Sequence, residues 1–382
     1  MNPIVYGLRC LRCGASHPAR PEAYDCLACR GQEGGVAGIL DAQLDYASAG
    51  SRFRAALAEA PSGNLSRYRA LLPIDPDSDT PVPPSPLIEA PALARELGLG
   101  RLLLKYEGAN PSQCLKDRAT ALAIPLARAA GADTLYCASA GNAAISLATF
   151  TRAAGLGCQV FVPGHLSQAR HAILTALGAT VHVADGVYDA AFEMAETVGR
   201  SSGWYSRNCA LNPWLVEGKK TVSFEIAEQL GWQVPDLVVA PAGDGCTLGA
   251  IGKGFRELAA IGMLERVPRL LGVQAAAVSP LVAMSEGSPP PARTGMTRAA
   301  SILVERPRNA RRLLAALADA GGGMVAVEDD ETADAQEALR EAVGGGVEFT
   351  SATTLAGLRR MPAGQMSPDT TVVLVVTSGR EG

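Results

Sequence analysis

The 382-residue sequence has no apolar run of roughly 18 residues or more, so a membrane-spanning helix is not expected. The apolar stretch of a secretory signal peptide is also missing from its first residues, MNPIVYGLRCLRC. Basic residues are not in excess, because 34 lysines and arginines stand against 38 aspartates and glutamates, for a formal net charge of −4. Without a basic patch, a nucleic-acid partner is not expected. These absences predict a cytoplasmic protein with neither a membrane nor a nucleic-acid partner.

Histidine is scarce as well, with four in the chain. None of them stands in the HExxH spacing of a zinc hydrolase, which argues against metallohydrolase chemistry. Ser378 lies in the sequence TSG and not in the GxSxG turn of a serine hydrolase. The sequence therefore indicates a site of another kind.

Cysteine is present in number, and four of the nine cysteines lie close together near the start of the chain. Cys10 and Cys13 form one CxxC pair, and Cys26 and Cys29 form a second after a turn-rich segment. Two such pairs can complete a tetrahedral Zn²⁺ site, whose four protein ligands leave no position open for chemistry. We expect a structural zinc ribbon. Reduced pairs without metal, or a redox CxxC, are the alternatives, although a redox pair normally begins a helix.

Beyond a connector with seven prolines at residues 73–91, the chain alternates between short apolar segments and helical patterns of 10 to 15 residues. This alternation predicts an α/β fold with parallel sheets covered by helices on both faces. Three of the expected strands end in glycine- or serine-rich turns, and ligands of open parallel sheets bind at such strand ends. The three turns have the sequences CASAGN, APAGDG and VVTSG.

The turn after the apolar segment LVVA is rich in glycine and precedes a helical pattern. Its N–H groups, together with the helix dipole, suit a phosphate. The spacing matches neither GxGxxG nor GxxxxGK[ST], so we expect a single phosphate; the alternative is an ordinary strand-to-helix turn. The residues of this loop are Gly243, Asp244, Gly245, Cys246 and Thr247.

Two further segments suggest ligand contacts. In SAGNAA, the turn from Ser139 to Asn142 could hold a carboxylate, or Asn142 could simply cap the helix. In NPSQCLKDR, Lys116 begins a helical pattern and could be an ordinary solvated lysine. A lysine that forms a Schiff base would instead have to be partly buried and close to a phosphate site.

Taken together, these segments resemble the fold-type II pyridoxal-phosphate (PLP) enzymes, and within them the branch of threonine synthase and cysteate synthase. NPSQCLKDR resembles NPSGSxKDR, which implies that Lys116 bears PLP. SAGNAA resembles SSGNAA, which implies that Asn142 meets the pyridoxal 3′-oxygen. The loop Gly243–Thr247 resembles the GDGC-type phosphate loop. VVTSGREG resembles the end of the last strand, where Thr377, or Ser378 as a second choice, would meet the pyridine nitrogen.

The resemblance implies two α/β domains of parallel or mixed sheets with the cofactor between them, a small zinc ribbon, and a homodimer. An amino-acid substrate would contact the SAGN turn and the region of the paired lysines near residue 220. The substrate-contact residues implied are Ser139, Ala140, Gly141 and Lys219. The expected segments are a ribbon at 1–40, an extension of the large domain at 41–110, a small domain at 111–225 and a large PLP-binding domain at 226–382.

The implied activity is that of a PLP-dependent carbon–oxygen lyase of amino-acid biosynthesis, which converts O-phosphohomoserine to threonine and phosphate. Leu215 stands where threonine synthases carry an arginine for the substrate's phosphate, and Gln113, Cys114 and Ala140 also depart from the family pattern. The alternative is therefore β-replacement or β-elimination on another amino acid, such as O-phosphoserine, serine or threonine. A third alternative, from another class, is a non-catalytic PLP-binding protein.

Overall fold

The computed structural model describes residues 1–29, 38–59, 63–76, 81–164, 167–186, 188–362 and 364–380. The chain forms two compact units. Unit 1 comprises Met1–Pro84 and Lys116–Lys219, and unit 2 comprises Ser85–Leu115 and Lys220–Gly382. The chain therefore passes between the units just before Ser85, Lys116 and Lys220. The expected boundaries at residues 110 and 225 lie close to two of these points, while residues 41–84, expected with the large domain, belong to unit 1.

Unit 1 begins with a small antiparallel sheet, in which the central strand β1 pairs with β2 on one side and with β3 on the other. The strands are β1 (Val5–Cys10), β2 (Ser16–His17) and β3 (Leu40–Leu44). A helix and a 3₁₀ segment follow, α1 (Tyr46–Glu59) and η2 (Leu65–Leu71). Phe53 of α1 stacks on Tyr68 of η2 with ring centroids 6.2 Å apart. This aromatic pair anchors α1 to the segment that follows it.

The second part of unit 1 is a parallel sheet with strand order β8-β7-β6-β9. Its strands are β6 (Thr134–Ala138), β7 (Gly157–Pro163), β8 (Thr180–Ala184) and β9 (Tyr205–Ser206). The helices of this part are α3 (Lys116–Ala129), α4 (Asn142–Ala154), α5 (Gln168–Ala176), α6 (Tyr188–Ser201) and α7 (Trp214–Lys219). The central strands are buried, as parallel strands covered by helices must be. Helix α3 continues through Pro125, which lies inside the helix.

Unit 2 is built on a sheet with strand order β12-β11-β10-β13-β5-β4. The strands are β4 (Leu87–Glu89), β5 (Arg101–Tyr106), β10 (Leu237–Pro241), β11 (Arg269–Ala275), β12 (Gly323–Val327) and β13 (Thr371–Val376). Neighbouring strands are parallel except at the edge, where β4 runs antiparallel to β5. The expected α/β fold with parallel and mixed sheets is confirmed.

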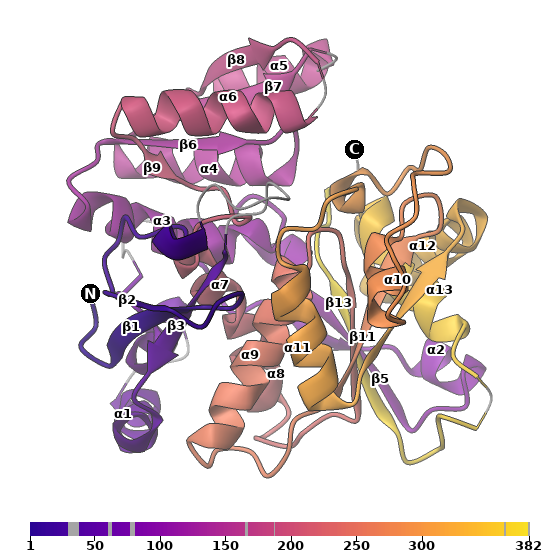
Figure 1. The fold of residues 1–382 in the computed structure, drawn as a ribbon. Helices are drawn as coiled ribbons and strands as arrows, with labels where there is room; N and C mark the ends of the chain where they lie inside the picture. Colours follow the sequence, from indigo (N-terminus) through magenta and orange to yellow (C-terminus); the bar gives the residue numbers. More distant parts are fainter. Residues whose placement is uncertain are drawn as a thin grey trace. The chain divides into compact units, whose positions relative to one another are not determined.

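Helices cover both faces of this sheet. They are α2 (Pro91–Glu96), α8 (Thr221–Gln229), α9 (Cys246–Ala260), α10 (Pro280–Ser285), α11 (Ala310–Ala320), α12 (Asp329–Val343) and α13 (Phe349–Arg359). Within unit 2, Figure 1 shows α8, α9 and α11 along one face and α2, α12 and α13 along the other. The parallel strands between them are almost wholly apolar, and β10 and β13 are buried nearly throughout. The chain also contains short 3₁₀ segments, η1 (Leu27–Cys29) in unit 1 and η3 (Glu107–Ala109) and η4 (Ala300–Ile302) in unit 2.

A buried charged pair lies within the core of unit 2. The Nζ atom of Lys105, on β5, is 2.7 Å from Oε2 of Glu225 on α8, and both side chains are buried. Lys105 also donates to the carbonyl oxygen of Ser85 at 2.7 Å and to Oε1 of Gln229 at 2.8 Å. The buried ammonium thus has hydrogen-bond partners, which a charge in a core requires. Among the described residues, no helix combines the length and the apolar character needed to cross a membrane.

Candidate functional site

Lys116 is the first residue of α3, and its side chain is half-buried. The segment that leads to it belongs to unit 2 and is bonded to the end of β13. The N–H of Leu115 donates to the carbonyl of Thr377 at 2.9 Å, and the N–H of Gly379 donates to the carbonyl of Gln113 at 3.0 Å. Two backbone hydrogen bonds therefore fix the segment that immediately precedes Lys116.

Two of the family departures lie in this segment. Gln113 has a φ of +60°, in the left-handed region that favours glycine, which is the residue that the resembling motif carries there. Cys114 is buried, and its sulfur lies 3.2 Å from the hydroxyl oxygen of Ser112. The main chain thus keeps the conformation of a glycine-bearing loop although a larger side chain occupies it.

The turn from Ser139 to Asn142 follows β6 directly. Ser139 donates its N–H to the carbonyl of Phe161 at 3.0 Å, and the hydroxyl of Ser139 accepts from the N–H of Gly141 at 3.2 Å. Gly141 occupies the N-cap position of α4, and Asn142 is the first helical residue, so the capping alternative for Asn142 does not describe this turn. Ser139, Ala140, Gly141 and Asn142 are all half-buried. Their polar groups are therefore within reach of a ligand.

The glycine-rich loop lies in unit 2, between β10 and α9. A Cβ atom on Gly243 would lie 2.8 Å from the Cα of Ile302, and one on Gly245 would lie 3.0 Å from the carbonyl oxygen of Asn309. Gly245 also has a φ of +88° and is the N-cap of α9. Both glycines are therefore required by the local geometry. Helix α9 begins at Cys246, directly after Gly245, and the first turn of a helix carries the positive end of its dipole.

Asp244, in the same loop, is held by the segment that leads into α11. One carboxylate oxygen accepts the N–H of Arg308 at 2.6 Å, and the other accepts from Nδ2 of Asn309 at 2.7 Å. The N–H of Asn309 in turn donates to the carbonyl of Asp244 at 3.0 Å. Asn309 is buried, so these contacts fasten the loop to the start of α11.

Thr377 and Ser378 follow β13 and differ in their surroundings. The hydroxyl of Thr377 is half-buried and lies 3.0 Å from the hydroxyl of Ser351 on α13. Ser378 is buried; its hydroxyl accepts the N–H of Arg380 at 3.1 Å, and its N–H donates to the hydroxyl of Ser351 at 3.0 Å. Ser351 therefore orients both residues, while Thr377 keeps the more accessible hydroxyl.

Helix α7 includes residue 215, the position at which the resemblance implies an arginine. Leu215 is fully buried there, and Lys219, in the last turn of the same helix, is buried as well. Gly218 lies so close to α3 that a Cβ atom would collide with the carbonyl of Arg118. Helix α7 therefore packs tightly on α3 and presents hydrocarbon at residue 215.

The four N-terminal cysteines come together in unit 1, where their sulfur atoms all lie within 4.8 Å of one another. The sulfurs of Cys10 and Cys29 are 3.8 Å apart, and those of Cys13 and Cys26 are 3.6 Å apart. A backbone hydrogen bond from Ala15 lowers the pKa of Cys13 to about 7, whereas burial raises that of Cys29 to about 12. Four thiolates therefore need a cation to coexist, and the cluster is compatible with a structural zinc ion.

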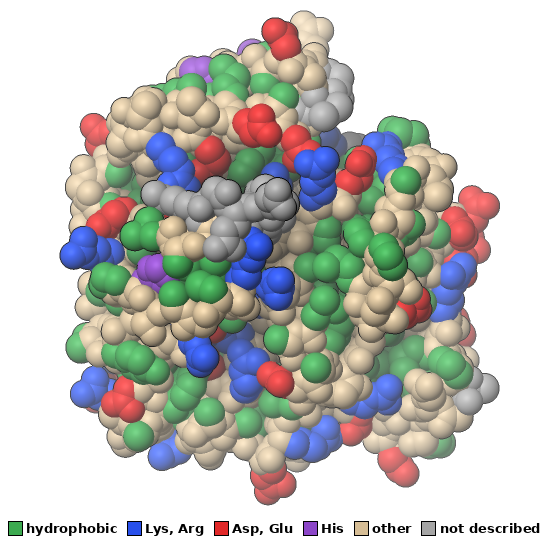
Figure 2. All heavy atoms as spheres, in the orientation of Figure 1, with side chains coloured by type: hydrophobic (Ala, Val, Ile, Leu, Met, Phe, Trp, Pro, Cys, Tyr) green, Lys and Arg blue, Asp and Glu red, His purple; other side chains and the backbone are tan. Residues whose placement is uncertain are grey.

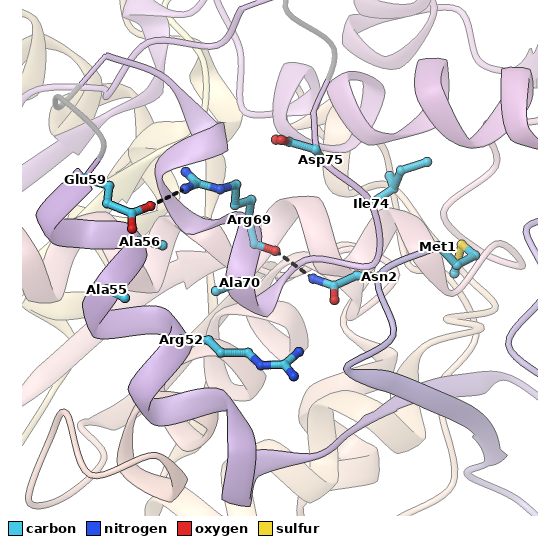
Figure 3. A pocket seen from close by; sticks show the side chains of 10 residues that line it. All are labelled: Met1, Asn2, Arg52, Ala55, Ala56, Glu59, Arg69, Ala70, Ile74 and Asp75. Atoms are coloured by element: carbon cyan, nitrogen blue, oxygen red, sulfur yellow. Dashed lines mark hydrogen bonds and ion pairs between the residues drawn. The ribbon is translucent and has the colours of Figure 1, made fainter.

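A separate cavity of about 540 Å³ also lies in unit 1, along α1 and η2. In Figure 3 the guanidinium of Arg69 reaches Glu59 at 3.3 Å, and the amide of Asn2 donates to the carbonyl of Arg69 at 3.0 Å. The residues around this cavity include none of the site residues expected from the sequence. On the face shown in Figure 2, basic and acidic side chains of the described residues are interspersed, in keeping with the small net charge.

The chain is similar to known proteins along most of its length. The family described as pyridoxal-phosphate dependent enzyme matches residues 79–378. Threonine synthase of Methanosarcina acetivorans is 34% identical over 379 residues, which cover 98% of this chain and 91% of that protein. Threonine synthase of Methanocaldococcus jannaschii is 32% identical over 377 residues, which cover 97% of this chain and 91% of that protein.

Solved structures share the fold at lower identity. Threonine deaminase isoform 2 of Solanum lycopersicum superposes with a TM-score of 0.68 at 19% identity, covering 87% of this chain and 89% of that chain. L-serine ammonia-lyase of Rhizomucor miehei superposes with a TM-score of 0.69 at 21% identity, covering 78% of this chain and 94% of that chain. The expected fold class is thereby confirmed.

Proposed function

Because this chain belongs to the pyridoxal-phosphate dependent enzymes, we propose that it is a threonine synthase that converts O-phosphohomoserine and water to threonine and phosphate. The observation that carries the proposal is the identity of 34% with a threonine synthase along nearly the whole length of both chains. This likeness extends over 98% of the chain.

The residues present suit the cofactor. In this proposal the amine of Lys116 is the point of covalent attachment, and the 3′-oxygen of the cofactor meets Asn142. The phosphate would bind the loop from Gly243 to Thr247, where two glycines let the loop pack against Ile302 and Asn309 and where α9 begins with the positive end of its dipole. The hydroxyl of Thr377 meets the pyridine nitrogen, because it is the more exposed of the two hydroxyls after β13.

When bound, PLP supplies an electron sink for the amino-acid substrate, and the protein supplies orientation and proton transfer. In this proposal the turn from Ser139 to Gly141 holds the substrate's carboxylate. The amine of Lys116, once released by the substrate, takes the proton from the α-carbon. A hydroxyl such as that of Thr377 does not keep the pyridine nitrogen protonated, as a carboxylate would. This favours elimination and replacement over transamination.

One observation favours a second candidate. The buried side chain of Leu215 offers no charge to a substrate phosphate, and leucine does not replace the paired N–H donors of an arginine. The second candidate is therefore dehydration of serine or threonine, which carry no phosphate, or β-replacement on O-phosphoserine, as in cysteate synthase, whose phosphate lies one carbon nearer to the α-carbon. In either case the roles of Lys116 and the glycine-rich loop stay the same, and only the substrate differs.

The experiment compares O-phosphohomoserine, O-phosphoserine, serine and threonine as substrates of the PLP-loaded protein, with Lys116→Ala as the inactive control. Release of phosphate with formation of threonine from O-phosphohomoserine supports the first candidate. Absence of turnover of O-phosphohomoserine, together with pyruvate or 2-oxobutanoate from another substrate, supports the second. Sulfite added with O-phosphoserine tests the replacement reaction directly.

A further inference from the structure

Arg207 follows the short strand β9 in unit 1, and its side chain lies in the interior. Its N–H donates to the carbonyl of Tyr136 at 2.8 Å, which continues the pairing of β9 with β6. The residue is 2% exposed, so its guanidinium has to find its partners within the protein.

The three guanidinium nitrogens face the first turn of α3 and a neighbouring thiol. Nη2 donates to the carbonyl oxygen of Lys116 at 3.0 Å, and Nε donates to the hydroxyl of Thr120 at 3.2 Å. Nη1 donates to the sulfur of Cys209 at 3.2 Å. A planar group with donors in fixed directions thus spans both ends of the first turn of the helix.

Thr120 closes this arrangement. Its hydroxyl donates to the carbonyl of Lys116 at 3.1 Å and lies 2.7 Å from the hydroxyl of Ser146 on α4. The carbonyl of Lys116 is therefore held both by an arginine and by a hydroxyl. A hydrogen bond from a charged donor is roughly twice as strong as a neutral one, so Arg207 makes the larger contribution.

Helix ends tend to fray, because their terminal residues have fewer hydrogen bonds than the interior. Lys116 occupies such an end, and the direction of its side chain depends on its own φ and ψ. Fixing its carbonyl group fixes the peptide plane and, with it, the direction in which the amine is presented. Misplacement of a reacting group by about 1 Å can cost a hundredfold in rate.

We propose that Arg207 is a positioning residue, which acts through the main chain of Lys116 to hold its amine ready for covalent attachment to the cofactor. The inference rests on the proposed role of Lys116. In the attachment, the nitrogen of Lys116 bonds to the aldehyde carbon of PLP and one water leaves. Arg207 takes no part in these bonds; it fixes where the nitrogen stands.

The test uses full-length protein freed of cofactor and then mixed with PLP. The variants are Arg207→Gln, Arg207→Lys and Thr120→Val. Arg128→Lys is the matched control, because Arg128 also lies on α3 and also donates to a backbone carbonyl, that of Ala154, but on the surface. The rate of attachment is followed by absorbance, and the attached lysine is identified by borohydride reduction and peptide mapping. Circular dichroism and thermal melting report folding.

We expect Arg207→Gln to slow attachment at Lys116 by about tenfold, as the loss of one charge-assisted hydrogen bond implies. Arg207→Lys should restore part of the rate, because lysine keeps the positive charge but lacks the planar guanidinium with its donors in fixed directions. Thr120→Val should slow attachment a few-fold. With substrate, kcat should fall while KM stays within about twofold, since in this proposal Arg207 acts on Lys116 and not on the substrate. Arg128→Lys should match the unaltered protein in all of these measurements.

Two results would overturn the inference, and they are distinguishable. If the reduced peptide contains a lysine other than Lys116, the proposed role of Lys116 fails and the inference fails with it. If Lys116 is labelled but folded Arg207→Gln attaches PLP at the normal rate, only the inference fails. Should Arg207→Gln not fold, Arg207→Lys and Thr120→Val decide the matter, and normal attachment rates in both would contradict the proposal.

Discussion

At the scale of the residue, Gln113 adopts a backbone conformation that favours glycine, the residue that the family motif carries there. Its φ of +60° lies where glycine is comfortable and other residues are strained. The strain is tolerated because both neighbouring segments are bonded: the carbonyl of Gln113 accepts from Gly379, and Leu115 donates to Thr377. The loop before Lys116 is therefore held by tertiary contacts and does not depend on local preference.

Gln113→Gly should accordingly stabilise the protein, by about 0.5 to 1 kcal/mol, because glycine adopts the positive φ without strain. Gln233→Gly is the matched control. Gln233 is exposed, and it is not one of the described residues whose φ is positive. The control should lose stability. Free energies of unfolding from urea denaturation decide between the two, and equal losses in both variants would contradict the strain at Gln113.

Gly243 supports a second prediction at this scale. Alanine there would place its Cβ 2.8 Å from the Cα of Ile302, and the backbone of the loop would have to move. We expect Gly243→Ala to weaken PLP binding by about tenfold or more, as the loss of one or more phosphate hydrogen bonds implies. Gly323→Ala is the control, because nothing lies within 4 Å of a Cβ at that position.

Fluorescence titration of cofactor-free protein with PLP measures both variants. Unchanged affinity in Gly243→Ala would show that this loop does not bind the phosphate. A loss in Gly323→Ala of similar size would mean that the effect is on folding and not on the loop.

At the scale of the element, strand β5 carries a buried charge on one residue and an exposed one on another. Lys105 pairs with Glu225 in the core, whereas Arg101 at the start of the strand pairs with Glu89 at the surface. Removing one partner of a buried pair leaves an uncompensated charge, which costs far more than breaking an exposed pair. The two pairs therefore provide an internal comparison on a single strand.

Lys105→Met should lower the free energy of unfolding by about 3 to 5 kcal/mol, because it leaves the buried carboxylate of Glu225 without its positively charged partner. Arg101→Met on the same strand should cost less than about 1 kcal/mol. Denaturant titration measures both. Similar values for the two variants would contradict the account of the Lys105 group as a paired charge in the core of unit 2.

Much of this architecture was predictable from the sequence. The apolar segments that became β6, β10 and β13 and the turns that follow them were recognisable, because parallel strands covered on both faces leave an uninterrupted apolar pattern. The antiparallel edge strand β4 was not expected, since it consists of three residues inside a proline-rich connector. Its pairing depends on β5 and not on its own sequence.

The contacts of Arg207 were not predictable either. Ninety-one positions separate this residue from Lys116, and its neighbours in the sequence carry no recognisable motif. The positive φ of Gln113 was likewise not predictable without the fold. In each case the missing information is a long-range contact, which composition and periodicity do not encode.

At the scale of the whole molecule, two kinds of site belong to different parts of the chain. The cysteine cluster lies among residues 10–29, outside the span 79–378 that matches the enzyme family. A ligand set of four cysteines has no open coordination position, so its contribution is to folding. The residues proposed for catalysis and cofactor binding all lie within the matched span.

We therefore expect about one Zn²⁺ per chain by elemental analysis, and a lower melting temperature after chelation. Cys26→Ser should lose the metal, whereas Cys158→Ser, at a buried cysteine outside the cluster, should retain it. Protein that is free of metal yet has an unchanged melting temperature and full activity would contradict a structural zinc ion at these cysteines.

The central claim is that this chain releases phosphate from O-phosphohomoserine and then adds water to the carbon chain at the neighbouring position. The most direct test is mass spectrometry of the product formed in water enriched in oxygen-18. The account predicts threonine that carries one solvent oxygen in its hydroxyl group, formed in equal amount to the phosphate released. Formation of homoserine, or no consumption of O-phosphohomoserine by protein with PLP bound at Lys116, would contradict it.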